Sequence, residues 1–210
     1  MKGKRNKYFL VFCLPVFLLV FPLRTPAQNP DINILRSLNV NRNIALDPVF
    51  SGFSWSVNPV GIGIPVSTLG WGYLAKDSVA KRNGFIMNES VVLASVLSAG
   101  LKYTVNRPRP FATYPFIEPV VHEGSPSFPS GHTTAAFAAA ASLSLCCPKW
   151  YVIVPSYLWA AAAGYSRMHL GVHYPSDVLA GALIGTGSAY LCYKTFNWVN
   201  RKVCRMLGKK

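Results

Sequence analysis

Residues 132–147 have the sequence HTTAAFAAAASLSLCC, in which alanine is the commonest residue. A related stretch, GALIG at residues 181–185, lies within the last long apolar segment. Alanine, glycine and serine let helix backbones approach closely, which suits helices that pack against one another within lipid. The two stretches therefore predict a bundle of closely packed helices.

Apolar segments recur along the whole chain. They lie near residues 57–75, 85–105, 132–147, 150–165 and 178–196. Several reach the roughly 20 residues that a helix needs to cross a bilayer, and the shorter ones would have to extend into flanking polar residues. Together with an apolar run at residues 8–23, they predict an all-α, membrane-embedded bundle of five to six transmembrane helices.

The composition also favours a membrane protein. Only 13% of the 210 residues are charged, whereas ordinary soluble domains have about 25%. The net charge of +14 is concentrated at the chain ends and between apolar runs, as in membrane proteins that mark their cytoplasmic side. No nucleic-acid-binding motif accompanies this charge, so we expect no nucleic-acid partner. The modest mean hydropathy of +0.28 keeps open a second hypothesis, a soluble α-helical protein exported to the periplasm.

The N-terminus has the layout of a signal peptide. A basic stretch, an apolar run and the small residues Thr25-Pro26-Ala27 follow one another, although an uncleaved anchor has the same layout. We expect four regions: a signal peptide or signal anchor at 1–27, an extracytoplasmic segment at 28–56, the main helical domain at 57–200 and a basic cytoplasmic tail at 201–210.

The distribution of lysine and arginine predicts the topology. If the N-terminus starts inside and each segment crosses once, the loops with Lys76, Lys81, Arg82 and Lys149 lie in the cytoplasm, as the positive-inside rule requires. The same topology brings residues 103–131 and residues 166–177 together on the outer side. These two stretches hold the remaining unusual polar residues.

The first polar cluster lies at the outer end of the apolar segment 85–105 and runs from Lys102 to Pro110. It contains Arg107 and Arg109, each followed by proline. Proline disfavours helical backbone at the preceding residue, so both arginines should project from extended or turning chain. Guanidinium groups held in this way suit phosphate oxygens. The alternative is a basic anchor beside the membrane, which the topology rule disfavours at an outer face.

The second polar cluster, PSFPSGHT at residues 126–133, leads directly into the alanine-rich stretch. At a helix N-terminus, Ser130 and Gly131 would offer a hydroxyl, free backbone N–H groups and the positive end of the helix dipole. These groups together make an anion site. His132 would then lie beside the bound anion. The same turn is also an ordinary helix cap, so this motif alone does not decide between the two.

The third polar cluster, SRMHLGVHYPSD, joins the last two apolar segments. It contains an arginine, two histidines and an aspartate: Arg167, His169, His173 and Asp177. Ionisable residues near lipid are functional by default. A metal site is one alternative, because the last three of these recur every four residues, as ligands on one helical face would. Pro175 argues against it, because proline interrupts such a face and favours a turn into the final helix.

Taken together, the three clusters resemble the signature motifs of the type 2 phosphatidic acid phosphatase (PAP2) superfamily. The matching residues are Lys102 with Arg109-Pro110, then Pro129-Ser130-Gly131-His132, then Ser166-Arg167 with His173 and Asp177. This superfamily also includes bacterial class A acid phosphatases and vanadium haloperoxidases. Motif order and internal spacing match over residues 85–195, so the resemblance implies that residues 57–200 form a PAP2-type phosphatase domain.

The resemblance implies a metal-independent phosphatase that forms a covalent phosphohistidine. His173 would be the nucleophile, Asp177 would hold its other ring nitrogen, and His132 would protonate the leaving group and then activate water. The substrate phosphate would be bound by Lys102, Arg109, Ser130, Gly131 and Arg167. No metal and no cofactor are expected.

The leading functional hypothesis is a phosphatase acting on a phosphate monoester or pyrophosphate of a lipid, at the periplasmic face of a bacterial inner membrane. The expected partners are the bilayer and the phosphorylated lipid. A soluble periplasmic class A-like acid phosphatase, a vanadate-dependent peroxidase and a membrane protein that binds or transports phosphate without chemistry are the alternatives. The sequence does not choose among phosphatidic acid, phosphatidylglycerophosphate, undecaprenyl pyrophosphate and lipid A, and it does not define an oligomeric state.

Four further polar residues have no assigned role in the resemblance. Arg107 would contact either a lipid headgroup or a neighbouring backbone carbonyl. His122, Glu123 and His169 would either line the mouth of the pocket or belong to a solvated loop, and we favour the solvated loop.

Overall fold

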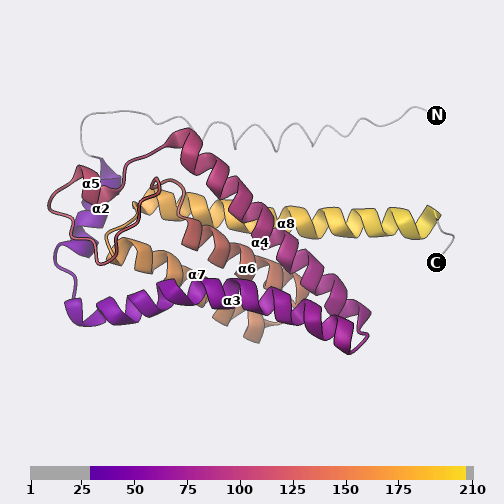
Figure 1. Cartoon of the computed structure of the whole chain (residues 1–210). Helices are drawn as coiled ribbons and strands as arrows, with labels where there is room; N and C mark the ends of the chain where they lie inside the picture. The colour runs from indigo at the N-terminus through magenta and orange to yellow at the C-terminus, as the bar shows by residue number, and fades with distance from the viewer. Residues whose placement is uncertain (1–28, 207–210) are drawn as a thin grey trace. The chain divides into compact units, whose positions relative to one another are not determined.

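The computed structural model describes residues 29–206, and within this range the chain is helical with no strand (Figure 1). The elements are α2 (Pro30–Asn39), the short 3-10 turn η1 (Ile44–Leu46), α3 (Asp47–Leu74), α4 (Ser78–Val105), α5 (Pro110–Thr113), α6 (Gly131–Cys146), α7 (Trp150–His169) and α8 (Pro175–Met206). The all-α prediction is confirmed. The predicted signal peptide or anchor at residues 1–27 and the end of the basic tail lie outside the described residues. Residues 31–206 form one compact unit.

Helix α6 is the centre of this unit and packs against α3, α4, α7 and α8. A core of small side chains, to which α6 contributes Ala136 and Ala140 and α7 contributes Ala160 and Ala163, allows the close approach. On α8, a Cβ atom at Gly185 would collide with the backbone of α6. The close helix packing predicted from the small residues is therefore confirmed.

The number of membrane crossings stays a prediction. Five helices have at least 16 residues, but among the described residues only the stretch Ser78–Thr113 is both long and apolar enough to cross a bilayer. Polar side chains and internal prolines lower the hydropathy of the other long helices. Helix α3, for example, contains Pro59 and Pro65. At about 1.5 Å per residue, α6 is also shorter than a hydrocarbon core of about 30 Å.

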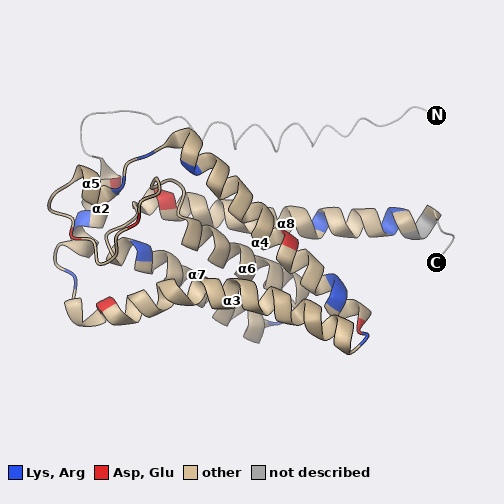
Figure 2. Cartoon of the chain, viewed as in Figure 1, with Lys and Arg blue, Asp and Glu red and all other residues tan. Residues whose placement is uncertain are grey.

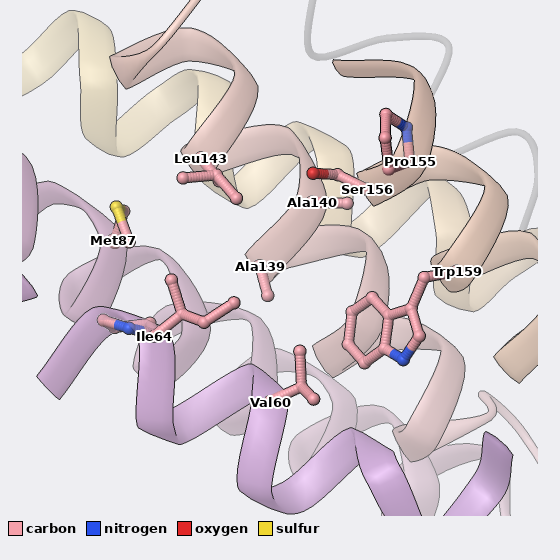
Figure 3. A pocket seen from close by; sticks show the side chains of 10 residues that line it. Val60, Ile64, Met87, Ala139, Ala140, Leu143, Pro155, Ser156 and Trp159 are labelled. Atoms are coloured by element: carbon pink, nitrogen blue, oxygen red, sulfur yellow. The ribbon is translucent and has the colours of Figure 1, made fainter. Parts of the chain in front are cut away.

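An apolar groove of about 210 Å³ lies in the middle of the bundle (Figure 3). Its lining comes from α3, α4, α6 and α7: Val60, Ile64, Pro65, Met87, Ala139, Ala140, Leu143, Pro155, Ser156 and Trp159. None of these lining residues is charged, so the groove offers nothing for phosphate chemistry. Charged residues lie instead mostly near helix ends and in loops (Figure 2).

The loops that carry the polar clusters meet at one end of the bundle. The Ser127 amide donates to the Arg107 carbonyl at 2.8 Å, and the Ser130 amide donates to the Asp177 carbonyl at 3.1 Å. Gly171 adopts a positive φ of 74°, and a Cβ atom there would lie 2.9 Å from the Glu118 carbonyl oxygen. The prediction that residues 103–131 and residues 166–177 lie together is confirmed.

Candidate active site

Helix ends present most of the predicted site residues. Lys102 lies in the last turn of α4 and Arg167 in the last turn of α7. Ser130 is the N-cap of α6, so the free backbone N–H groups of that helix begin at Gly131. Arg109 has extended backbone (φ −74°, ψ 155°), as the following proline predicts.

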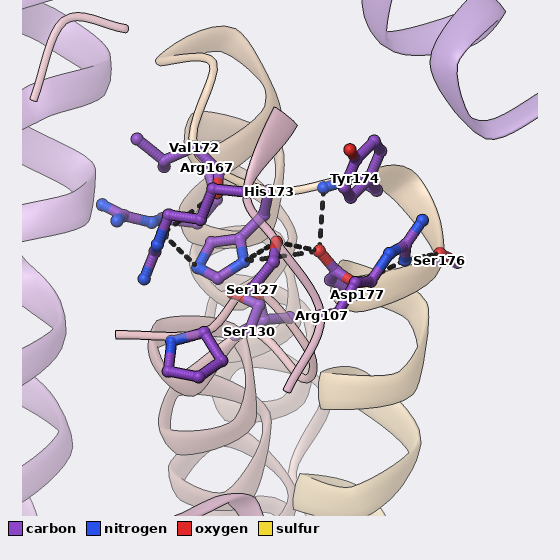
Figure 4. Close-up of polar contacts among 12 residues, drawn as sticks. Arg107, Ser127, Ser130, Arg167, Val172, His173, Tyr174, Ser176 and Asp177 are labelled. Atoms are coloured by element: carbon purple, nitrogen blue, oxygen red, sulfur yellow. Dashed lines mark hydrogen bonds and ion pairs between the residues drawn. The ribbon is translucent and has the colours of Figure 1, made fainter. Parts of the chain in front are cut away.

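The turn between α7 and α8 presents the two remaining members of the third motif. His173 lies in the turn itself, and Asp177 lies in the first turn of α8, which begins at Pro175. The predicted turn between the two residues is confirmed. The structure therefore brings together residues from all three motifs (Figure 4).

His173 is only 1% exposed and lies between an arginine and a carboxylate. Its Nε2 atom is 3.4 Å from the guanidinium of Arg109. A guanidinium only donates, so Nε2 presents its lone pair and the ring proton belongs on Nδ1. That Nδ1 atom is 3.6 Å from Asp177 Oδ2. Burial lowers the pKa of His173 to about 4, although the Asp177 carboxylate raises it, so the imidazole is neutral near pH 7.

Asp177 is fully buried and its carboxylate is held by several donors. Oδ2 accepts a hydrogen bond from the Ser127 hydroxyl at 2.5 Å and from the Tyr174 amide at 3.0 Å. Oδ1 accepts from the guanidinium of Arg107 at 2.7 Å. Ser127 also lies 3.4 Å from His173 Nδ1. Sequence reasoning missed Ser127, whose only signal was its place three residues before Ser130.

The side chain of Glu123 bridges the two buried arginines predicted to bind phosphate. Its Oε2 accepts from Arg109 at 2.6 Å, and its Oε1 accepts from Arg167. Burial alone would raise the pKa of Glu123, but the positive charges of Arg167 and Arg109 lower it to about 2. The preference for a solvated loop at Glu123 was wrong, because the buried guanidinium groups draw the carboxylate inward. A carboxylate thus lies where the resemblance places the substrate phosphate.

Other contacts fix the two arginines in place. Arg109 donates from Nε to the Ser125 carbonyl at 2.7 Å and from its guanidinium to the Val172 carbonyl at 3.0 Å. Arg167 donates to the Ser54 hydroxyl of α3. Within the described part of the chain, the buried Nε of Arg167 has no hydrogen-bond partner. Both guanidinium groups are therefore oriented before any substrate arrives.

The start of α6 completes the cluster. The Ser130 hydroxyl accepts from Thr133 at 2.9 Å, which leaves its own proton to donate. Lys102 lies beside Gly131, since a Cβ atom on the glycine would be 3.8 Å from the lysine Cε. The Lys102 ammonium group donates to the Pro126 carbonyl at 2.6 Å. His132 is half-buried, and burial together with the positive charge of Arg167 lowers its pKa to about 4. The ring is therefore neutral near pH 7 until an anion binds beside it.

Arg107 and His169 both make contacts that the sequence did not predict. Arg107 binds the carboxylates of Asp177 and Asp31 instead of a headgroup or a backbone carbonyl. His169 is buried, and its Nε2 lies 2.7 Å from Asp47 Oδ1. The solvated-loop interpretation of His169 was wrong, because α7 continues through this residue and the start of α3 covers it.

Two sequence hypotheses remain, the solvated loop at His122 and the metal site. His122 is exposed, in agreement with the favoured solvated loop. In the described range of the chain, no group of three or more His, Cys, Asp or Glu side chains is arranged to hold a metal ion. His169, which the metal hypothesis required, pairs with Asp47 instead.

Comparison with known proteins agrees with these motifs. Residues 83–201 match the PAP2 superfamily. The chain is 31% identical over 195 residues to an undecaprenyl-diphosphatase of Sulfolobus acidocaldarius, an alignment that covers 89% of this chain and 90% of the relative.

Two solved structures share the fold. LpxE of Aquifex aeolicus has a TM-score of 0.68 at 28% identity, covering 80% of this chain and 97% of LpxE. The first transmembrane PAP2-type phosphatidylglycerolphosphate phosphatase from Bacillus subtilis has a TM-score of 0.69 at 26% identity, covering 92% of this chain and 96% of that protein. The chain therefore belongs to the PAP2 superfamily and is a phosphatase.

Proposed function

We propose that this phosphatase is embedded in a membrane and removes phosphate from a phosphorylated or diphosphorylated lipid through a phosphohistidine on His173. The observation that carries the proposal is the neutral, buried imidazole whose Nε2 lone pair faces Arg109 while Nδ1 faces Asp177. The names of the undecaprenyl-diphosphatase and phosphatidylglycerolphosphate phosphatase relatives support a lipid substrate.

In the first step, the substrate phosphate takes the place of the Glu123 carboxylate. Arg109 and Arg167 then donate to phosphoryl oxygens instead of to Glu123, and Lys102 adds a third positive charge. The N-terminus of α6 at Gly131 contributes backbone N–H groups and its dipole. Such preoriented charges and donors stabilise a phosphoryl-transfer transition state without reorganisation.

The chemical steps use two histidines. His132 takes up a proton when the phosphate anion binds beside it. His173 Nε2 then attacks phosphorus in line, the bond from phosphorus to the leaving oxygen breaks, and protonated His132 gives that oxygen its proton. Asp177 stabilises the positive imidazole of the phosphohistidine through Nδ1–H. Next, His132 removes a proton from water, the resulting hydroxide attacks phosphorus, and cleavage of the P–N bond restores neutral His173 with release of inorganic phosphate.

The proposed orientation places the active site on the periplasmic side of a bacterial inner membrane. Lys76 lies in the turn between α3 and α4, Lys81 and Arg82 lie near the start of α4, and Lys149 precedes α7. These are the helix ends opposite the site, so the positive-inside rule assigns them to the cytoplasm. Large apolar side chains that are more than half exposed, such as Val92 on α4 and Leu183 on α8, would face lipid.

Phosphate release by detergent-purified protein tests the proposal. The substrates are phosphatidic acid, phosphatidylglycerophosphate, undecaprenyl pyrophosphate and lipid A, each with and without EDTA. We expect hydrolysis of at least one lipid that persists in EDTA, and a loss of roughly 10⁴-fold or more in His173→Asn. Strict loss on chelation would overturn the metal-free mechanism.

Two further outcomes of the same experiment decide between the alternatives. Wild-type protein that binds these lipids but hydrolyses none of them would favour a phosphate-binding or transport protein. Activity in the soluble periplasmic fraction instead of washed membranes would favour a class A-like acid phosphatase.

A further inference from the structure

A chain of ion pairs leads from the catalytic aspartate to a helix that precedes all three motifs. Asp177 Oδ1 accepts from Arg107 at 2.7 Å, and the other end of the same guanidinium donates to Asp31 Oδ2 at 2.7 Å. Asp31 lies in the first turn of α2, 76 residues before Arg107. Neither residue belongs to the pattern that the three motifs share with the superfamily.

The guanidinium of Arg107 makes two further contacts. It stacks over the ring of Tyr174, with 3.8 Å between its central carbon and the ring centroid. It also donates to the Ser176 hydroxyl at 2.7 Å. Burial alone would lower the pKa of Arg107, but the Asp177 and Asp31 carboxylates raise it, so the side chain stays charged. Lysine could not reproduce this arrangement, because one ammonium group lacks the planar fork that reaches two carboxylates.

Asp31 also fixes the start of the helix that carries Asp177. Its Oδ1 accepts from the Ser176 backbone amide at 2.8 Å, and its Oδ2 accepts from the Ser176 hydroxyl. A carboxylate at this position satisfies a free N–H group of the first turn of α8 and interacts favourably with the helix dipole. Asp31 thus holds Asp177 in two ways, through Arg107 and through the backbone of α8.

The donors to the two carboxylate oxygens of Asp177 determine how it faces His173. Ser127 and the Tyr174 amide both bind Oδ2, the oxygen that faces His173 Nδ1. Arg107 is the side chain that binds Oδ1. Without it, a buried carboxylate would lose its cation partner, which is costly, and the carboxylate would be held at Oδ2 alone.

We propose that Arg107 and Asp31 are positioning residues that fix the Asp177 carboxylate for the reaction at His173. Substrate phosphate is bound elsewhere, by Arg109, Arg167 and the start of α6. Loss of the Arg107–Asp31 ion pair, which we call the bridge, therefore lowers kcat and leaves KM nearly unchanged. The inference rests on the proposed nucleophilic role of His173.

Steady-state kinetics of Asp31→Asn, Arg107→Ala and Arg107→Lys on a lipid phosphate that the wild type hydrolyses test this role. We expect kcat to fall about 10-fold in Asp31→Asn and up to about 100-fold in Arg107→Ala, with KM changed less than about twofold. Arg107→Lys should recover only part of the loss. Because Asp31 acts partly through Arg107, the loss of kcat in the double variant Asp31→Asn/Arg107→Ala should be smaller than the product of the two single losses.

Asp77→Asn provides a matched control. Asp77 caps α4 at the opposite end of the bundle, accepting from the Val79 and Ala80 amides at 2.8 and 3.1 Å. Asparagine caps a helix about as well as aspartate, so this variant should stay folded and keep its kcat. Thermal melting of each purified variant shows whether it is folded.

Full kcat in Asp31→Asn and Arg107→Ala would overturn the inference, as would an equal loss of kcat in Asp77→Asn or additive losses in the double variant. If Arg107→Ala fails to fold, the kcat values of Asp31→Asn and Arg107→Lys still test the positioning role. Retained turnover in His173→Asn would instead overturn the proposed function. Loss in His173→Asn with full activity in both bridge variants would overturn the positioning role alone.

Discussion

Two groups of charged residues flank His173, and they have opposite compositions. They are a cradle cluster of Arg109, Arg167 and Glu123, and an anchor cluster of Arg107, Asp31 and Asp177. The cradle cluster has two cations and one anion, so it is net positive and faces the Nε2 side of the ring. The anchor cluster has one cation and two anions, so it is net negative and faces the Nδ1 side. This difference matches the proposed chemistry, in which an anion binds on one side and a cation develops on the other.

The two clusters also differ in how firmly they hold their carboxylates. Glu123 comes from a loop, its side chain is 27% exposed, and both of its partners are arginines. Asp177 comes from the first turn of α8, its side chain is 0% exposed, and it accepts hydrogen bonds from two side chains and a backbone amide. A carboxylate on a loop at the edge of solvent is the one that substrate can displace. The Asp177 carboxylate, in the first turn of α8, is the one that must keep its position during the reaction.

The largest predicted effect tests the anchor cluster. Asp177→Asn should lower kcat by about 10⁴-fold, because an amide neither fixes the Nδ1–H tautomer nor stabilises the positive phosphohistidine. The measurement is kcat for lipid phosphate hydrolysis, with melting temperature as the check on folding. A folded Asp177→Asn protein that keeps more than about a tenth of wild-type kcat would show that the anchor cluster has no part in the chemistry.

The next largest effect tests the cradle cluster, where the substitution should strengthen the binding of phosphate instead of weakening a function. Glu123→Gln should tighten inhibition by inorganic phosphate by about tenfold, because a neutral amide competes less well than a carboxylate for the two guanidinium groups. The measurement is the inhibition constant of inorganic phosphate against a hydrolysed lipid. Glu118→Gln is the matched control, since Glu118 is an exposed residue of the same loop, and it should leave the inhibition constant unchanged. Weaker inhibition in Glu123→Gln would mean that Glu123 organises the arginines instead of competing with phosphate.

The sequence predicted the two arginines of the cradle cluster and the aspartate Asp177 of the anchor cluster, from the motif resemblance and from local signals. Proline after Arg109, the Ser130-Gly131 turn and Pro175 before Asp177 determine where helices start and how the neighbouring side chains project. Such signals act over a few residues, so they are visible without knowledge of the tertiary structure. The all-α fold was predictable for the same reason, since hydrophobic runs and small residues act locally.

The pairings that complete the site were not predictable, because their partners are far apart in the sequence. Arg107 and Asp31 are 76 residues apart, and His169 and Asp47 are 122 residues apart. Glu123 lies in a polar loop whose composition resembles that of any solvated segment. Only the buried positions of Arg109 and Arg167 in the folded chain explain why this one carboxylate turns inward. Charge pairing over such distances is a property of the tertiary fold.

The smallest predicted effect, an absence of pH dependence, distinguishes a charged cradle carboxylate from a titrating one. With its pKa lowered to about 2 by Arg167 and Arg109, Glu123 is ionised at every pH well above 2 and becomes neutral only as the pH falls through that value. Protonation of the phosphate itself affects wild type and variant alike. The ratio of the phosphate inhibition constants of wild type and Glu123→Gln should therefore stay constant between about pH 5 and pH 8. A ratio that falls toward one as the pH drops through about 5 would mean that Glu123 titrates near its ordinary pKa and is not held by the two arginines.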